Sequence, residues 1–496
     1  MKKNYFLLIF IFSIATLNFS LYAQNVSTEG KDFWLGFMEN HETSQIDLEI
    51  FISAADTTEG KVEMPYYNWS TPFVTYPGIT AKVTVPTSYA MNRGSGLIVN
   101  KGIHISAENN VSVYALNKRS FSSDATVILP SISLGKEYMA MAHMESNGGG
   151  PSLFSEILIV AISDQTELQI TPSVLTTDGN LANLPFQITL NEGQTYQLQS
   201  NYDLTGTKVE TINSELGDCK NFAVFGGNEW TRIGGCNGAQ DNLYEQMFPV
   251  NTWGKEFISI PYKTRIGGDI IKILAAEDST SFQINGGIKY LLNAGKFKSI
   301  LLSSTAFIKS DKPISIGQFS RSQSCDGVEA DPFFIMLSPV EQRLKKVTFN
   351  ALEIHVVDRY YLNIIVSTIG VDKTFLNGSN ISGILNPVAG NPDFSYAQID
   401  IEEGNHTLEC DDGFIAYVYG YGRIESFGYA TGVSLQNLNL KIESGEPGSD
   451  LTIKKDSTCI GDPVEFSVDA DSSFIFFDWD FGDGNYASGK TVVHSF

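Results

Sequence analysis

The sequence predicts an all-β protein whose main part consists of tandem sandwich-like repeats. Val, Ile, Thr, Phe and Tyr dominate short runs separated by Gly, Asn, Asp and Pro, which is the pattern of strands and turns. No long stretch has the hydrophobic period of an amphipathic helix. ILIVAIS at 157–163, IIKILAA at 270–276 and LNIIVST at 362–368 each have the length and composition of a buried strand.

A repeated motif divides the chain into four units. It combines glycine, lysine, an acidic residue and an aromatic residue, and a hydrophobic strand and an Asp/Thr turn follow it. It occurs as Gly-Lys-Asp-Phe at 30–33, Gly-Lys-Glu-Tyr at 135–138, Gly-Lys-Glu-Phe at 254–257 and, in altered form, Leu-Lys-Lys-Val at 344–347. We therefore expect a head at 24–434 with units at about 25–130, 131–249, 250–339 and 340–434.

The first three units close on an aspartate, a hydrophobic run and a proline. These closing segments are 123–130, 241–249 and 331–339, whereas the fourth unit ends in SFGYATG at 426–432. We expect the closing aspartates to bond nearby backbone amides. Units of this length hold about eight strands, enough for one sandwich. Two propeller blades would need the same number, so a β-propeller-like head is the alternative.

The N-terminus predicts export. Lys2 and Lys3 precede a short apolar run, and Leu-Tyr-Ala at 21–23 resembles a signal-peptide cleavage site. We expect a signal peptide at 1–23, cleaved after Ala23. The apolar run is too short for a membrane-spanning helix, and no later segment is apolar enough to span a bilayer. We predict a secreted or cell-surface protein with no membrane insertion.

The net charge of the chain argues against two classes of binding partner. The chain has 33 basic and 56 acidic residues, for a net charge of −23. Such an acidic protein is a poor partner for nucleic acid or anionic membranes. We expect an extracellular protein or a glycan as the partner.

A polar, Gly- and Pro-containing stretch at 435–450 predicts a linker, and 451–496 predicts a separate small β domain. That domain contains the acidic cluster Asp478, Asp480 and Asp483. Calcium binding by these three carboxylates is one hypothesis. A tight Asp-Gly hairpin with Trp479 in the core is the favoured interpretation. No cofactor other than this possible calcium is expected.

The body of the chain resembles the IgGFc-binding protein N-terminal domain family. The resemblance is carried by FAVFGGNEW (222–230), CNGAQDNLYEQMFPVNTWGKEF (236–257), IGGDIIKILAAEDSTSFQING (266–286) and 310–342. TEGKDFWLGFMEN at 28–40 resembles the start of bacterial members. The resemblance implies an extracellular binding or structural module, without a residue-level Fc-binding motif.

The tail resembles a PKD domain, an Ig-like sandwich of surface proteins. Trp479 to Gly484 and His494-Ser495-Phe496 carry this resemblance. It covers only the first part of such a domain, so we expect an incomplete PKD domain at 451–496, as in a fragment of a longer protein. Cys459 lacks the late partner that such domains often supply.

Candidate ligand-binding residues are aromatic. The six histidines are scattered, and no metalloprotease, nucleophile-elbow, Walker or dinucleotide motif is present. We therefore expect no enzymatic activity and no catalytic residue. Tyr66, Tyr67 and Trp69 follow Pro65 in a predicted loop and are the candidate ligand contacts, although core packing is the favoured interpretation of their rings.

Four cysteines of the head are disulfide candidates: Cys219, Cys236, Cys325 and Cys410. Three pairings are possible. The preferred pairing joins Cys219 to Cys236 in a short loop and Cys325 to Cys410 between units three and four.

These observations together predict a non-catalytic adhesion or binding protein with a repeat-built head and an Ig-like spacer. One alternative is a carbohydrate-recognition module of a polysaccharide-degrading system. Another is a structural matrix protein.

Overall fold

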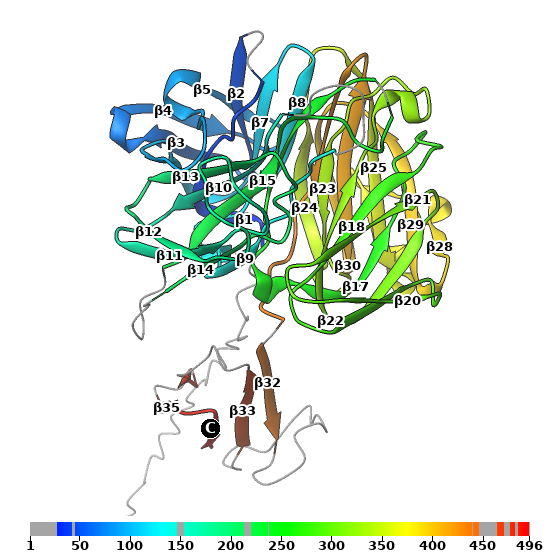
Figure 1. The fold of residues 1–496 in the computed structure, drawn as a ribbon. Coiled ribbons are helices and arrows are strands. Elements are labelled where there is room, and N and C mark those ends of the chain that lie inside the picture. The colour runs from blue at the N-terminus through cyan, green and yellow to red at the C-terminus, as the bar shows by residue number, and fades with distance from the viewer. Residues whose placement is uncertain are drawn as a thin grey trace, which may run out of the picture.

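The computed structural model describes residues 27–41, 45–145, 153–212, 220–236, 238–438, 440–445, 464–470, 477–481 and 485–495. The predicted all-β, sandwich-like class is confirmed, because strands form nearly all of the regular structure (Figure 1). The predicted signal peptide at 1–23 lies outside the described residues.

Unit one has two layers that share one long strand. The first half of β7 lies between β3 and β1, and its second half lies between β2 and β8. The outer strands β4 and β5 extend the two layers. The elements are β1 (Glu29–Leu35), β2 (Ile46–Ser53), β3 (Thr58–Met64), η1 (Pro65–Tyr67), β4 (Trp69–Thr75), β5 (Ala81–Val85), α1 (Thr87–Ala90), β6 (Ile98–Val99), β7 (Ile103–Arg119) and β8 (Ser122–Ile128).

Unit two has the same layers and takes one strand from unit one. The sheets have the strand orders β12-β11-β14-β9 and β16-β15-β10-β13-β6, so β6 of unit one forms an edge of unit two. The counterpart of β7 is divided into β14 and β15, on either side of 213–219. The elements are η2 (Ser131–Ser133), β9 (Glu137–Met139), β10 (Ser155–Ala161), β11 (Thr166–Thr171), β12 (Phe186–Leu190), β13 (Thr195–Ser200), β14 (Lys208–Thr211), β15 (Phe222–Thr231) and β16 (Asp241–Gln246).

Unit three repeats the plan of unit one around the shared strand β22. The first half of β22 pairs with β17 and β19, and its second half pairs with β18 and β23. The elements are η3 (Val250–Thr252), β17 (Gly254–Ser259), β18 (Asp269–Ala275), β19 (Thr280–Ile284), β20 (Lys289–Leu292), β21 (Phe297–Leu302), β22 (Ala306–Phe319), η4 (Gln323–Cys325) and β23 (Phe334–Leu337).

Unit four repeats the plan around β30 and adds a short edge strand, β28. Its elements are β24 (Leu344–Ala351), β25 (Val357–Ser367), η5 (Thr368–Lys373), β26 (Thr374–Leu376), β27 (Ser379–Asn380), η6 (Ser382–Ile384), β28 (Asn386–Val388), β29 (Asn391–Ile401), β30 (Gly404–Gly422) and β31 (Glu425–Ala430). In all four units each layer turns its apolar side chains inward, which produces a large continuous core.

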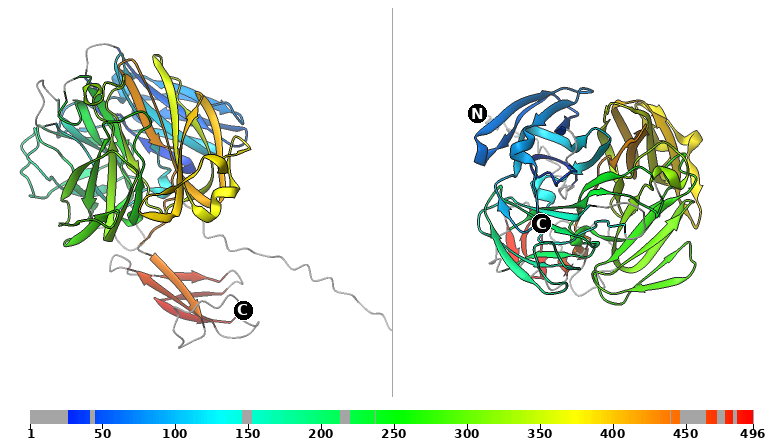
Figure 2. Two further views of the ribbon diagram at one scale, coloured as in Figure 1. Left: turned by 90° about the vertical axis from the view of Figure 1, so that its right-hand side faces the viewer. Right: turned by 45° about the horizontal axis from the view of Figure 1, so that its top comes forward.

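The four units surround a common centre, as the right-hand view of Figure 2 shows. Their closing strands β8, β16, β23 and β31 meet there, each contacting the next. Side chains bond the backbone of the neighbouring strand: the Tyr244 N–H donates to Asp124 Oδ2 at 3.0 Å, and the Met336 N–H donates to Glu245 Oε1 at 2.9 Å. The head is therefore a ring of four sandwiches.

The two ends of the head close the ring. The Thr28 N–H donates to the Val433 carbonyl at 3.0 Å, and the Val433 N–H donates to Thr28 Oγ1 at 3.0 Å. Thr28 is fully buried at this junction. The start of unit one thus pairs with the end of unit four.

The described part of the tail lies outside the head (Figure 1). It forms a three-stranded and a two-stranded sheet, in the orders β32-β33-β36 and β34-β35. The strands are β32 (Leu440–Gly445), β33 (Val464–Ala470), β34 (Asp478–Asp480), β35 (Tyr486–Ser488) and β36 (Thr491–His494). Residues 440–445, predicted as linker, instead form β32, because their backbone pairs with β33.

Candidate functional site

An exposed tyrosine surface lies on unit one and consists of Tyr66, Tyr67 and Tyr89. Their exposed fractions are 47%, 36% and 39%. Tyr66 and Tyr67 belong to η1, which joins β3 to β4, and Tyr89 belongs to α1. Strands β3 and β4 lie at the edge of the head (Figure 1). Exposed tyrosines offer an apolar ring and a polar hydroxyl together, which suits contact with another molecule.

The local sequence determines the shape of the turn that carries two of these tyrosines. Pro65 at the first position of η1 presets the backbone for a tight helical turn. Asn68 ends the turn in the left-handed conformation, with φ of 50°, and its N–H donates to the Pro65 carbonyl at 3.3 Å. The chain then enters β4 at Trp69. The turn therefore holds Tyr66 and Tyr67 outside the sheet.

Contacts with other segments hold the tyrosines in place. The rings of Tyr67 and Tyr89 stack with centroids 4.5 Å apart and planes at 12°. Tyr66 lies beside Gly193 of unit two, where a Cβ on residue 193 would be 3.5 Å from the Tyr66 ring. The surface thus reaches the boundary between units one and two.

A hydrogen-bonded cluster of His104, Asp32 and Glu63 holds the end of β3 that leads into the turn. His104 Nε2 lies 2.6 Å from Asp32 Oδ2, and His104 Nδ1 lies 3.0 Å from Glu63 Oε1. Burial lowers the pKa of His104, but the hydrogen bonds to Asp32 and Glu63 outweigh it and raise this pKa above its ordinary value. The Trp34 ring stacks on the imidazole at 4.6 Å. This His104 cluster therefore joins β1, β3 and β7 just before the chain enters η1.

The predicted aromatic contacts divide into two kinds. Tyr66 and Tyr67 are exposed, whereas Trp69 is half-buried and packs against the core. Sequence reasoning missed Tyr89 because it comes from a separate short helix after β5. The pairing of Tyr67 with Tyr89 depends on how the two segments meet in space.

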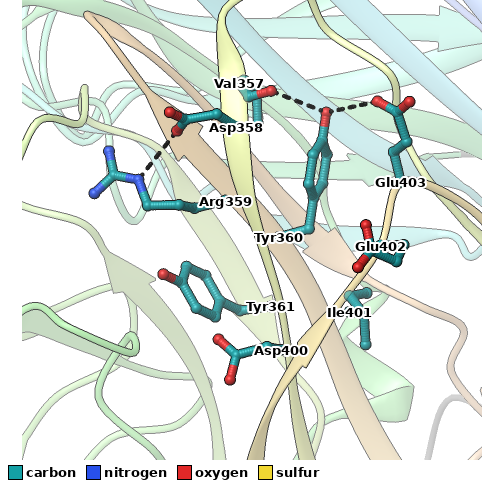
Figure 3. Close-up of a pocket in the computed structure, with 9 residues that line it drawn as sticks. All are labelled: Val357, Asp358, Arg359, Tyr360, Tyr361, Asp400, Ile401, Glu402 and Glu403. Atoms are coloured by element: carbon teal, nitrogen blue, oxygen red, sulfur yellow. Dashed lines mark hydrogen bonds and ion pairs between the residues drawn. The ribbon is translucent and has the colours of Figure 1, made fainter.

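A second candidate is an acidic hollow on unit four, lined by the start of β25 and the end of β29 (Figure 3). Its volume is about 390 Å³. Four carboxylates and one guanidinium line it: Asp358, Asp400, Glu402, Glu403 and Arg359. A basic segment would be attracted there and an anion repelled.

Several polar groups of this hollow already have partners in the protein. The Tyr360 hydroxyl donates to the Val357 carbonyl at 3.3 Å and approaches Glu403 Oε2 at 3.4 Å (Figure 3). Burial, followed by the Glu403 charge, raises the pKa of Tyr360 to about 12. Arg359 pairs with Asp358 at 3.1 Å and donates to the Glu329 carbonyl of unit three at 2.6 Å. The guanidinium therefore helps to join units three and four.

The calcium hypothesis concerns residues whose side chains are not described. Asp483 lies outside the described residues, and the backbone of Asp478 and Asp480 forms β34. Within the described part of the chain, no group of three or more His, Cys, Asp or Glu side chains is arranged to hold a metal ion. Calcium in the tail stays a prediction.

The preferred disulfide pairing is wrong. Cys236 is bonded to Cys325, and Cys410 is a free, buried thiol. Cys236 and Cys325 lie on neighbouring loops of units two and three, with their Cα atoms 5.4 Å apart, whereas Cys410 lies in the core on β30. Cys219 and Cys459 are outside the described residues.

Buried acids at the centre of the ring were also unexpected. Asp241, Asp331 and Glu425 begin or precede the closing strands of units two, three and four, and all three are almost fully buried. Burial, and then the charges of Asp331 and Glu425, raise the pKa of Asp241 well above its usual range. Only part of the predicted local bonding is present: Asp241 accepts from the Asn242 N–H at 2.8 Å, whereas neither Asp331 carboxylate oxygen has a hydrogen-bond partner among the described residues.

Comparison with known families matches residues 124–420 to the family described as IgGFc binding protein. The match covers more than half of the chain. The chain belongs to the IgGFc binding protein family. The match begins at the closing strand of unit one and ends in β30 of unit four, so the tail lies outside it.

A human relative, the IgGFc-binding protein of Homo sapiens, is 22% identical over 421 residues. The alignment covers 82% of this chain but 7% of the human protein. This member of the family thus spans a small part of that relative's length. In the present chain, the disulfide and the exposed tyrosine surface both lie in the head.

Among solved structures, the N-terminal eight Ig domains of Down Syndrome Cell Adhesion Molecule align with 92% of this chain and 69% of that chain, at 9% identity. The TM-score is 0.10, so this likeness carries no argument about the fold. Within the described residues, no helix has the length and apolarity to cross a membrane.

Proposed function

We propose that this family member is an extracellular, non-catalytic binding protein that holds a partner protein at the tyrosine surface of unit one. The observation that carries the proposal is the stacked pair Tyr67 and Tyr89, held at 4.5 Å while both rings stay exposed. Tyrosine offers a large contact area at a low cost in side-chain entropy. A pair fixed before binding lowers that cost further.

Family membership supports a binding role, and the name of the human relative suggests the first partner to test. That relative is called IgGFc-binding protein. The Fc fragment of immunoglobulin G is therefore the first probe, followed by mucins and matrix proteins. The predicted signal peptide supports an extracellular location.

The test compares a variant that lacks the tyrosines before the start of β4 with a control that lacks the tyrosine after its end. The head is immobilised, and binding of Fc, mucin, fibronectin and collagen is measured by biolayer interferometry. We expect the double variant Tyr66→Ala, Tyr67→Ala to lose at least about tenfold in affinity, as hot-spot tyrosines do. Tyr76 is the matched control, because it is 48% exposed and follows the opposite end of the same strand.

Two results would contradict the proposal. One is binding to none of these extracellular proteins. The other is equal affinity of the double variant and the Tyr76→Ala control. A melting temperature unchanged by the substitutions shows that the head remains folded.

We also propose that the tail is an Ig-like spacer of the PKD type, with calcium as a possible ligand of its acidic cluster. Trp479 supports a packed domain, since its Nε1 donates to the Gly489 carbonyl at 2.8 Å and its ring lies 5.8 Å from that of Phe466. Calorimetric titration of the full chain with calcium tests the ligand. If the titration gives no heat of binding, the proposal that the tail binds calcium is wrong.

A further inference from the structure

We propose that a cavity between units two and three binds a neutral carbohydrate. The cavity has a volume of about 850 Å³, within the range of small-ligand sites. Unit two contributes segments 143–145, 201–203 and 234–235, and unit three contributes residues of β18 and β21. This site is separate from the tyrosine surface and does not depend on the function proposed for it.

The ammonium group of Lys272, buried in the cavity wall, already has three hydrogen-bond partners. Lys272 Nζ donates to Asp203 Oδ2 at 2.7 Å, to the Ala142 carbonyl at 2.6 Å and to Thr205 Oγ1 at 3.2 Å. An ammonium group has three donors, so none is left for a ligand. The positive charge of Lys272 is matched inside the protein by Asp203.

The second acid of the wall is likewise engaged. Glu145 Oε2 accepts from the N–H groups of Gly234 and Gly235, both at 3.1 Å. An anionic ligand would lose its hydration without finding a free positive charge, which is costly. The site therefore disfavours an anionic ligand.

His143 adds an uncharged ring to the cavity wall. It is 8% exposed, and both of its ring nitrogens are buried. Burial, and then the charge of Lys272, lower the pKa of His143 to about 4. At neutral pH the ring therefore carries no positive charge that could attract an anion.

The rest of the lining also suits a sugar. Tyr202 is 59% exposed at the cavity, and Phe297 is half-buried in its wall. Asn201 and Ser299 add neutral polar groups at exposed positions. A sugar ring has an apolar C–H face and a rim of hydroxyls, so an aromatic ring beside neutral polar groups complements both parts.

The disulfide holds one wall in position. Cys236 follows Gly234 and Gly235, and its bond to Cys325 attaches this loop to unit three. Arg321 of unit three also contacts this loop, since its Nη2 donates to Cys236 Sγ at 3.4 Å. A wall fixed before binding reduces the entropy lost when the ligand enters.

The experiment uses the full chain on an array of defined oligosaccharides of about two to four sugars, both neutral and sialylated. The strongest neutral binder is then titrated by calorimetry against Ser299→Trp, which fills the cavity from an exposed strand position, and Tyr202→Ala. We expect each variant to lose at least about tenfold in affinity. Tyr76→Ala, on unit one and outside both proposed sites, keeps the affinity of the wild type.

Three outcomes would overturn the assignment. They are no neutral glycan bound, binding of sialylated glycans alone, or affinity unchanged in both Ser299→Trp and Tyr202→Ala. Because both substitutions are at exposed positions, the melting temperature shows directly whether a loss of binding comes from the site or from unfolding.

Discussion

Gly135 packs directly against Pro249, the first residue of a repeated motif against the last residue of the same unit. A Cβ on residue 135 would lie 2.5 Å from the Pro249 Cβ. Units one and three contain the same contact: a Cβ on residue 30 would lie 2.4 Å from the Pro130 Cβ, and a Cβ on residue 254 would lie 2.3 Å from the Pro339 Cβ. Both ends of the repeat are therefore parts of one packing contact.

Gly135→Ala should destabilise the head by about 1–3 kcal/mol, because the added methyl overpacks the contact with Pro249. Adding Pro249→Gly removes the Cβ that the new methyl would meet and should restore part of this loss. Denaturant unfolding of the single and double variants measures the coupling between the two residues. Strictly additive effects would show that they do not act together.

Thr28→Val should weaken ring closure. The Val433 N–H would lose the hydroxyl that accepts its hydrogen bond at 3.0 Å in a buried position. We expect a loss of about 1–3 kcal/mol in the free energy of unfolding, as for a buried unsatisfied donor. Thr28→Ser keeps the hydroxyl and is the control. Equal losses in Thr28→Val and Thr28→Ser would contradict this role of the hydroxyl.

The disulfide between Cys236 and Cys325 closes a loop with a sequence separation of 89. Replacing both cysteines with serine should cost about 4–5 kcal/mol, the range expected for a loop of this length. Mass mapping of a non-reduced digest should recover the two peptides linked, with Cys410 alkylated only after unfolding. A Cys325–Cys410 link in that digest would show the pairing to be wrong.

The head should lose stability as the pH rises from about 4.5 to 8. Burial raises the pKa of Glu425 to about 7 and that of Glu245 to about 8, so the folded state binds more protons than the unfolded state in this window. This contribution is complete below the unfolded pKa values and disappears as the pH passes the folded ones. Asp241 and Asp331 act in the same direction, while Lys118 and Arg119 lower the pKa of Glu425.

Glu425→Gln isolates one of these groups. Relative to the wild type, its free energy of unfolding should rise by roughly 3 kcal/mol from pH 4.5 to 7.5, at about 1.4 kcal/mol per pKa unit. Because the wild type and Glu425→Gln both contain His143, the difference between them cancels the opposite contribution of this residue, whose lowered pKa favours folding at higher pH. Chemical unfolding across this pH range gives the values, with the exposed Glu59→Gln as control. Parallel pH profiles for the wild type and Glu425→Gln would exclude this role of Glu425.

Local patterns were enough to predict the strand class and the loop after Pro65, but not the exposure of Tyr66 and Tyr67, for which core packing was the favoured interpretation. The alternation of apolar runs with turn residues depends on near neighbours, and so does the Pro65 turn. Trp69, in contrast, turned toward the core, because its burial depends on how β4 lies on the rest of unit one. Unit four also departs from the Gly–Pro rule: Leu344 replaces the glycine, and its side chain lies near Gly432, 3.1 Å from the position a Cβ would take.

The sequence by itself determined an all-β chain of repeated motifs, because hydrophobic period and turn chemistry are properties of short segments. Only the tertiary structure decided that four sandwiches close into a ring, that Cys236 meets Cys325, and that Asp241 and Asp331 share a buried centre. These pairs are far apart in the chain, and their contacts come from the packing of one unit against the next. No local pattern encodes such a distance, so the buried charges and the cavity at His143 could be found only once the units were in place.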